Sequence, residues 1–302
     1  MRLSFLSLLL LLTACSGSDE EKDSGTGGDN GGDTGVDCTG IDCWVDVTTP
    51  YVGETTCFDG TNWGLGQTVD PSHAGAMVTL TGTINDFQED EPVEGASLKV
   101  WFNDDINGTA DITSESDASG QLTETVPACV PIAYETYTPP EWEKTKDTYE
   151  VHQVYSPTET SDTWNSVSVA TSRLIPSLLG LTWDPATGII AGTAYDCNED
   201  PIQNAQVYIH DAAGNAPDTM QIRYFANSLP NSEQPYTNDD GLWSAVNVPV
   251  GDWIVEMWVW DGTQRVLLGS TELNIKADSV NISNVYTGIN DGVYLPGSCL
   301  VP

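Results

Sequence analysis

The stretch Leu80-Thr81-Gly82-Thr83-Ile84-Asn85-Asp86 has a counterpart at Ile190-Ala191-Gly192-Thr193-Ala194-Tyr195-Asp196, with glycine and aspartate at matching positions. The match continues downstream, where Glu91 to Val100 corresponds to Asp200 to Ile209. An insertion then separates Ile209 from Tyr236 in the second copy. A match of this length indicates that the chain contains two copies of one structural unit.

Each copy has the residue pattern of short β-strands joined by tight turns. Apolar and polar residues alternate along Leu98 to Phe102 and along Gln206 to His210, as in half-buried strands. Asp117 to Gly120 and Asn238 to Gly241 place a carboxylate or amide first and glycine last, which favours turns with positive φ. A helical period is nearly absent, and the sequence predicts one helical turn, Pro176 to Leu181. We therefore predict an all-β chain with two tandem antiparallel Greek-key β-sandwiches.

These motifs resemble those of the carboxypeptidase regulatory-like domain, a transthyretin-like (prealbumin-like) β-sandwich. The shared pattern is Pro-x-x-x-Ala-x-Val, then Asp-x-x-Gly-x-Phe/Trp, then a Pro-x-Gly loop such as Pro249-Val250-Gly251. The resemblance covers 76–135 and 187–288, and the first copy departs from it at Ala128-Cys129. We expect 136–186 to be a connector with extra strands. The resemblance implies a non-catalytic accessory module, because the regulatory domain of that family carries no catalytic residues.

The N-terminus has the pattern of a lipoprotein signal peptide, 1–14. Arg2 precedes an apolar stretch, and Leu12-Thr13-Ala14-Cys15 resembles the bacterial lipobox, which implies acylation of Cys15 with palmitate-type chains. A plain signal peptide is the alternative. The residues 15–37 are predicted to form the lipid anchor and an acidic, glycine-rich tether. A cysteine-containing segment, 38–75, and a C-terminal tail, 289–302, flank the two copies.

Charge narrows the possible partners. The 302 residues include 9 Lys or Arg and 45 Asp or Glu, which gives a formal net charge of −36. Binding to nucleic acid is excluded, because the chain lacks the basic surface that phosphate contacts require. We expect contact with the membrane through the lipid anchor and location at the bacterial outer membrane, on a side that the sequence does not specify. The expected partner is an envelope protein or a polysaccharide.

The cysteine count predicts disulfides. With Cys15 assigned to lipid, an even number of cysteines remains, which in an exported chain indicates up to three disulfides among Cys38, Cys43, Cys57, Cys129, Cys197 and Cys299. The pairing stays open, and one option joins Cys197 to Cys299 and clamps the tail onto the second copy. A structural zinc site is the alternative, which the lack of a CxxC motif disfavours.

Motifs for catalysis are absent from the sequence. No Gly-x-Ser-x-Gly, His-Glu-x-x-His or Gly-x-x-x-x-Gly-Lys pattern occurs, and His73, His152 and His210 are far apart. We therefore predict that the protein is not an enzyme and has no catalytic residues, and we keep an envelope hydrolase as a third hypothesis.

One loop has the composition of a calcium site. The oxygen-bearing residues Asn103, Asp105 and Asn107 alternate before a glycine, although Ser114 stands where such loops place a bidentate glutamate. We predict that the protein requires no cofactor. Calcium is the metal that the oxygen-rich composition of this loop favours. A solvated turn is the alternative.

Three tryptophans are candidates for ligand binding. Trp258 and Trp260 share one face of a predicted strand with Glu256, and Trp101 shares a face with Lys99. Solvent-facing indole rings are suited to stacking on sugars, whereas rings that cover an inter-domain contact or a loop are the alternative. We predict a non-catalytic binding, adhesive or scaffolding lipoprotein of the envelope. The alternative function is a carbohydrate-binding lipoprotein that uses these three rings.

Overall fold

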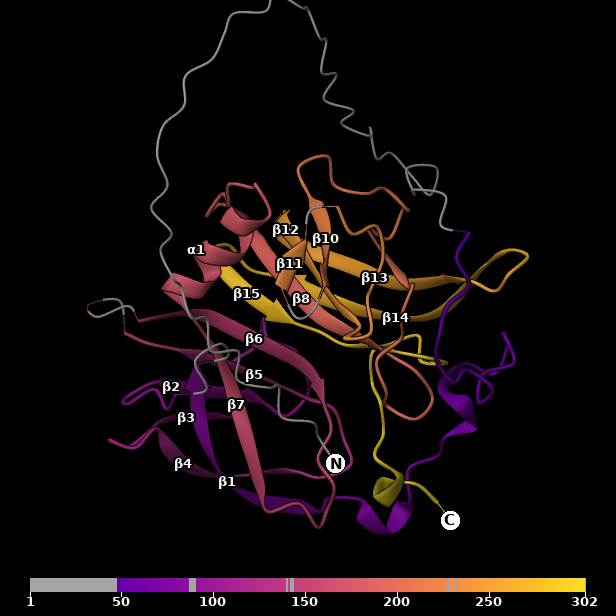
Figure 1. Ribbon diagram of the computed structural model, residues 1–302. Helices are drawn as coiled ribbons and strands as arrows, with labels where there is room; N and C mark the ends of the chain where they lie inside the picture. The colour runs from indigo at the N-terminus through magenta and orange to yellow at the C-terminus, as the bar shows by residue number, and fades with distance from the viewer. Residues whose placement is uncertain are drawn as a thin grey trace, which may run out of the picture.

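The chain folds into two β-sandwich repeats with one helix between them (Figure 1). The computed structural model describes residues 48–86, 91–139, 141, 144–226, 229–231 and 233–301. Cys15, Cys38, Cys43, the signal peptide and the tether lie outside the described residues. The predicted all-β class is confirmed.

The first repeat comprises seven strands in two layers. They are β1 (Met77–Asp86), β2 (Ser97–Trp101), β3 (Ile112–Glu115), β4 (Gln121–Pro127), β5 (Ile132–Tyr137), β6 (Thr145–Gln153) and β7 (Ser161–Ser168). One layer has the order β4-β1-β7, with β1 and β7 parallel, and the other has the order β3-β2-β5-β6. Alternate side chains such as Leu80, Leu98 and Trp164 fill the space between the layers. The strands β6 and β7 lie in the segment expected to be a connector, and they pair with β5 and β1 of this repeat.

The second repeat has the same arrangement with one change. Its strands are β8 (Gly188–Tyr195), β9 (Gln206–His210), β10 (Gln221–Ala226), β11 (Leu229–Asn231), β12 (Leu242–Val248), β13 (Gly251–Trp260), β14 (Arg265–Ile275), β15 (Ser279–Ile282) and β16 (Val285–Tyr286). The layers are β11-β10-β12-β8-β15 and β14-β13-β9, and β8 is again parallel to its closing strand, β15. The segment between Ile209 and Tyr236, where the second copy is longer than the first, forms β10 and β11. The strand β10 pairs with β12, whereas its counterpart β3 pairs with β2.

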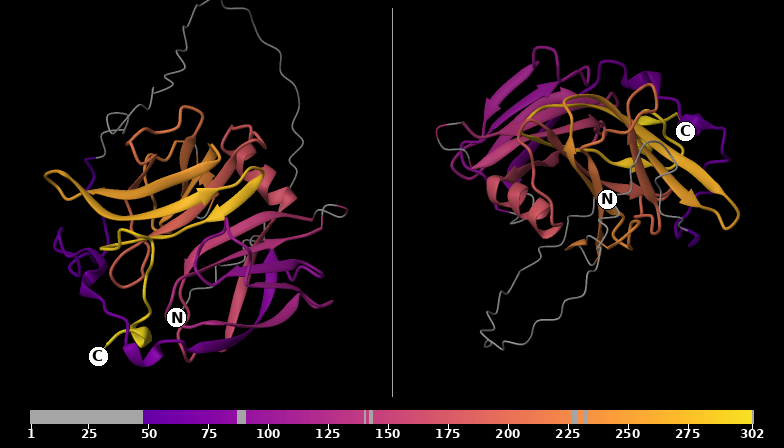
Figure 2. Two further views of the ribbon diagram at one scale, coloured as in Figure 1. Left: turned by 180° about the vertical axis from the view of Figure 1, so that it is seen from behind. Right: turned by 90° about the horizontal axis from the view of Figure 1, so that it is seen from above.

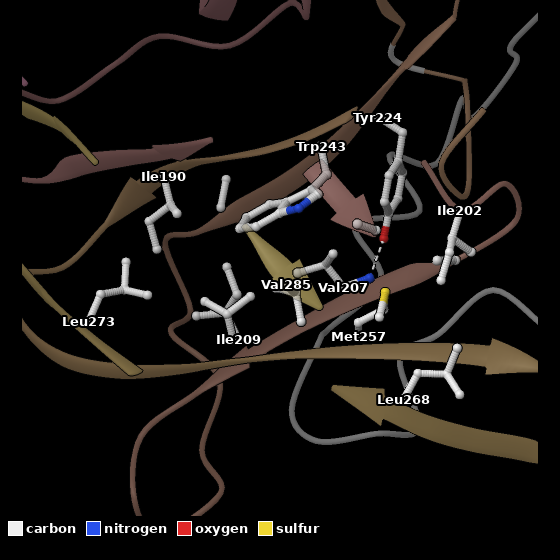
Figure 3. Packing of buried hydrophobic residues seen from close by; sticks show 14 of the residues in the cluster. Ile190, Ile202, Val207, Ile209, Tyr224, Trp243, Met257, Leu268, Leu273 and Val285 are labelled. Carbon is white, nitrogen blue, oxygen red and sulfur yellow. Dashed lines mark hydrogen bonds between the residues drawn. The ribbon is translucent and has the colours of Figure 1, made fainter. Parts of the chain in front are cut away.

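The core of the second repeat lies between its two layers (Figure 3). The ring of Trp243 packs beside Ile190 and Val285, and all three side chains are almost fully buried. The hydroxyl of Tyr224 accepts a hydrogen bond of 2.8 Å from the backbone N–H of Val207, which ties β10 to the opposite layer.

A single strand joins the repeats into one continuous sheet. The short strand β15 pairs in parallel with β8 on one side and with β6 of the first repeat on the other, so that Val280 faces Ile189 and Thr148 in the two ladders. Figures 1 and 2 show β15 and β6 side by side at the boundary between the repeats. Without this pairing, β6 and β15 would each expose an open sheet edge. Their pairing provides hydrogen-bond partners for the backbone groups of both edges.

The helix α1 (Val169–Leu178) connects β7 to the second repeat. Its first turn is capped by Ser168, whose side-chain oxygen accepts the N–H of Thr171 at 3.1 Å. The predicted helical turn, Pro176 to Leu181, is therefore misplaced: it covers the end of the helix and the loop that follows. The cap at Ser168 starts the helix earlier, and the left-handed Gly180 follows its end.

The residues 48–75, here called the N-terminal strap, run from the second repeat to the first. Val52 pairs with Gln203 of the second repeat, and the carbonyl oxygen of Ala76, just after the strap, accepts from the N–H of Ala128 in the first. The strap contains two short 3-10 turns, η2 (Trp63–Gly66) and η3 (Pro71–His73), and Val69 pairs with Leu300 beside η5 (Gly297–Cys299). No helix among the described residues is long and apolar enough to cross a membrane.

Candidate functional site

The junction of the repeats contains a half-buried histidine that contacts both of them. His152 lies near the end of β6 with a left-handed backbone, φ 60°. Its backbone N–H donates to Asp104 Oδ1 at 2.9 Å, and its Nδ1 lies 2.5 Å from Asp104 Oδ2. Its Nε2 lies 2.6 Å from the carbonyl oxygen of Glu272 on β14. Both ring nitrogens therefore face acceptors, an arrangement that only the doubly protonated imidazolium satisfies.

The surroundings of His152 raise its pKa above the ordinary value. Burial alone would lower that pKa, because it disfavours the charged ring. The hydrogen bond and the charge of Asp104, together with the carbonyl of Glu272, outweigh burial. These contacts therefore favour the charged form of the ring and link the two repeats, and we call them the His152 clamp.

A shallow cavity of about 330 Å³ adjoins the His152 clamp. It is lined in part by Trp253 and Asp252 of β13 and by Asn274 of β14. The indole N–H of Trp253 donates to the carbonyl oxygen of Pro249 at 2.7 Å, and the amide of Asn274 donates to Asp252 Oδ1 at 2.6 Å. These wall groups are therefore already engaged in hydrogen bonds within the second repeat.

The three histidines do not form a nucleophile–base pair among the described residues. His152 contacts a carboxylate and a carbonyl, as described above. His210 Nδ1 lies 2.7 Å from the carbonyl oxygen of Asp211, and its Nε2 lies 3.5 Å from Glu256 Oε1. His73 Nδ1 lies 3.5 Å from the sulfur of Cys129, which is bonded to another cysteine. None of these contacts would activate a serine or cysteine for attack.

The predicted calcium loop uses its oxygen atoms internally. Asn103 Oδ1 accepts from the N–H of Asp105 at 3.4 Å, and Asp105 Oδ1 accepts from the N–H of Asn107 at 3.0 Å. The ammonium of Lys276 donates to Asn107 Oδ1. Among the described residues no three or more His, Cys, Asp or Glu side chains are grouped to hold a metal. Calcium binding at Asn103, Asp105 and Asn107 stays a prediction.

The tryptophan candidates differ in exposure. Trp101 is only 4% exposed, so the prediction that its ring faces solvent is wrong. The loop after β2 folds back over the ring, which packs with Ile106 and Tyr149, and the indole N–H donates to the carbonyl oxygen of Gly108 at 3.0 Å. Trp258 and Trp260 are half-buried, and the N–H of Trp258 donates to Glu256 Oε2 at 2.8 Å. A ligand role for these two rings stays a prediction.

Two disulfides link distant parts of the chain. Cys57 of the N-terminal strap is bonded to Cys197 of the second repeat, and Cys129 of the first repeat is bonded to Cys299 of the tail. The considered pairing of Cys197 with Cys299 is therefore wrong. The tail instead runs back to the first repeat, where Cys299 packs with Val154.

A polar cluster around the buried Glu135 in the first repeat has no counterpart in the sequence motifs. Glu135 is 3% exposed and accepts from the ammonium of Lys99 at 2.8 Å and from the hydroxyl of Tyr149 at 3.1 Å. Burial and the charge of Glu135 raise the pKa of Asp147 to about 6. The three strands β2, β5 and β6 place these groups on one face of their sheet. Strand alternation alone predicts polar residues there but not their burial.

Comparison with known proteins gives only distant structural similarity. No protein family and no curated protein matches the chain. The shaft pilin SpaA from Lactobacillus rhamnosus GG aligns with 12% identity over 73% of this chain and 99% of that chain, with a TM-score of 0.22. The minor pilin GBS52 from Streptococcus agalactiae aligns with 11% identity over 74% and 99%, with a TM-score of 0.23. The TIE protein of Bacillus anthracis aligns with 12% identity and a TM-score of 0.23 over 70% of this chain, which spans about a third (34%) of that protein.

Proposed function

We propose that this protein is a non-catalytic scaffolding module of the bacterial envelope, in which two β-sandwich repeats act as one rigid body. The pairing of β15 with both β8 and β6 carries the proposal, because it replaces the hinge expected between tandem domains with a continuous sheet. The two disulfides and the His152 clamp add covalent and charged links across the same body. A rigid body of this kind is suited to holding partners at a fixed spacing.

The proposal includes attachment to the outer membrane through lipid on Cys15. The lipobox-like sequence before Cys15 and the acidic tether after it support this part. Metabolic labelling with radioactive palmitate and fractionation of cells test it. We expect label in the wild-type protein and a soluble, unlabelled protein for Cys15→Ser, whereas membrane retention of the unlabelled variant would contradict lipid anchoring.

Calorimetric unfolding of the full chain tests the rigid body. We expect one cooperative transition in which the calorimetric and van't Hoff enthalpies agree, because unfolding either repeat breaks the shared sheet. Two separate transitions would show that the repeats are independent domains and would refute the scaffold as described. Reduction of the disulfides serves as a second condition, and the strand pairing predicts that the transition stays single after reduction.

Carbohydrate binding is a second candidate function, favoured by one observation. Trp258 and Trp260 are half-buried on the face of β13 that points away from the core, and Glu256 precedes Trp258 on the same face and accepts from its indole N–H. Indole rings and a carboxylate on one strand face offer stacking surface and hydroxyl acceptors to a sugar. Titration with neutral polysaccharides tests it: Trp258→Ala and Trp260→Ala should each abolish binding, and unchanged binding in both would rule out this face.

A further inference from the structure

Two of the few positive charges of this acidic chain line one cavity. Only nine residues of the chain are Lys or Arg, and Lys144, Lys146 and Arg173 lie within 30 positions of each other. Lys146 and Arg173 line a cavity of about 580 Å³ between α1, the start of β6 and the turn before β15. Figure 1 shows α1 at this edge of the molecule, where β6 and β15 meet. The cavity is within the range of volumes that hold small molecules.

Of the two cations in this cavity, Arg173 has no partner among the described residues. Lys146 is largely buried, and its ammonium lies 2.9 Å from Asp278 Oδ2 and 5.7 Å from the centre of the Trp183 ring. The guanidinium of Arg173 is exposed and makes no hydrogen bond or ion pair with any described residue. The described lining residues include two cations and one carboxylate, which together carry a charge of +1. A ligand with one negative charge would neutralise it.

The remaining walls suit a ligand that is both apolar and rich in hydroxyl groups. Pro176, Leu181 and Pro185 contribute apolar surface, and Ser177 and Thr182 contribute exposed hydroxyls. Asp278 is 47% exposed, so its carboxylate can accept from hydroxyls in addition to Lys146. The indole N–H of Trp183 is buried and lacks a hydrogen-bond partner among the described residues, which leaves an unsatisfied donor in the wall.

We propose that this cavity binds an acidic sugar residue of a polysaccharide, a uronic acid in which a single carboxylate pairs with Arg173. The guanidinium forms two parallel hydrogen bonds with a carboxylate, and the ring hydroxyls bond to Asp278 and to Ser177 or Thr182. The C–H face of the sugar ring lies against the prolines and the exposed part of Trp183. A peptide carboxylate would also pair with Arg173, but its backbone carries no hydroxyl donors for Asp278. The acidity of the rest of the chain excludes polyanions held by charge alone.

This proposal is independent of the scaffold and of the sugar-binding face at Trp258 and Trp260. Titration calorimetry of the full-length protein at physiological salt tests it, because screening then weakens repulsion from distant acidic residues more than contact within the cavity. The probe is trigalacturonate, and its methyl ester is the uncharged control. We expect trigalacturonate to bind and the ester to bind at least about tenfold more weakly, since the loss of a charged bidentate pair removes that much affinity.

Variants assign the binding to the cavity. Arg173→Gln should weaken trigalacturonate binding at least about tenfold, whereas Arg265→Gln, which removes one positive charge on the β13–β14 hairpin, should leave it unchanged. Trp183→Phe keeps the apolar contact and should retain measurable binding. Absence of binding, equal affinity for the ester, or equal loss in both arginine variants would overturn the proposal. If a tripeptide with a free carboxyl terminus binds as tightly as trigalacturonate or more tightly, the ligand of the cavity is a peptide and not a sugar.

Discussion

The Nε2 atom of His152 in the first repeat lies 2.6 Å from the carbonyl oxygen of Glu272 in the second, while its Nδ1 faces the carboxylate of Asp104. A neutral imidazole can donate from only one nitrogen, so one of these two contacts loses its proton when the ring titrates. The junction of the repeats therefore contains a contact whose strength depends on pH.

The His152 clamp should stabilise the fold most at acidic pH. The pKa of His152 is raised in the folded protein, so its contribution is fully present below the unfolded-state pKa of about 6.5 and is lost as pH rises through the folded-state pKa. We expect His152→Asn to lower the free energy of unfolding by about 2 kcal/mol at mildly acidic pH, the range for charged hydrogen bonds. Chemical unfolding at a series of pH values measures the difference between the wild type and the variant.

The difference in the free energy of unfolding between the wild type and His152→Asn separates the contribution of His152 from that of other groups that titrate in the same pH range. The pKa of Asp147 is raised to about 6 by burial and by Glu135, so Asp147 gains a proton in a similar pH range, but it does so in both proteins. His210→Asn is the matched control, because His210 contacts groups of its own repeat only in the described structure. A difference that is constant from acidic to alkaline pH would show that the clamp is not charged.

Equivalent glycines of the two repeats should tolerate no side chain. A Cβ atom on Gly82 would collide with the carbonyl oxygen of Asp162 in β7, and one on Gly192 would collide with the carbonyl oxygen of Ser283. In both repeats, therefore, the segment that packs parallel to the glycine strand approaches too closely for any other residue. We expect Gly82→Ala and Gly192→Ala each to lower the free energy of unfolding by about 3 kcal/mol, at the upper end for overpacking.

Thermal or denaturant unfolding measures the stability of Gly82→Ala and Gly192→Ala, with Gly297→Ala as the control. A Cβ atom on Gly297 meets no atom within 4 Å among the described residues, and its backbone needs no positive φ. The control should therefore be nearly neutral. Equal stability of Gly192→Ala and the control would mean that the parallel strand can move away.

These glycines also illustrate what the sequence predicts and what it does not. The repeat spacing identified Gly82 and Gly192 as equivalent, and the strand and turn patterns around them are local, so the sandwich class was predictable. The pairing of β15 with β6 was not, because a parallel ladder between distant strands leaves no turn signal in the sequence.

The candidate sites show the same limit. Alternation placed Trp101 on a face of β2 opposite its core residues, but burial depends on whether a loop covers that face, and here the loop around Ile106 does. The contact between His152 and Asp104 joins residues 48 positions apart with no motif in common. Lys146 and Arg173 are 27 positions apart in the sequence with no motif between them, and only the fold brings them to one cavity.

The two disulfides should each make a large contribution to stability. They close loops with sequence separations of 140 and 170 residues, and long loops lose most entropy on cross-linking in the unfolded chain. We expect Cys57→Ser/Cys197→Ser and Cys129→Ser/Cys299→Ser to lower the free energy of unfolding by about 3–4 kcal/mol each. Mass spectrometry of a non-reduced digest checks the pairing, and a peptide pair linking Cys197 to Cys299 would contradict it.

The pair formed by Lys99 and Glu135 should behave as a buried ion pair with one exposed end. Glu135 is almost fully buried, whereas the Lys99 side chain is 33% exposed. In Lys99→Met, the buried Glu135 carboxylate still accepts from the hydroxyl of Tyr149 but has lost its cationic partner, so we expect a loss of about 2 kcal/mol, below the range for fully buried pairs. Glu135→Gln keeps a hydrogen-bond acceptor for both neighbours and removes the charge. The double variant Lys99→Met/Glu135→Gln should therefore lose less free energy of unfolding than the two single variants lose in sum. A double-mutant cycle by denaturant unfolding measures this coupling, and strictly additive losses would show that the carboxylate is stabilised by its hydrogen bonds alone and not by the charge of Lys99.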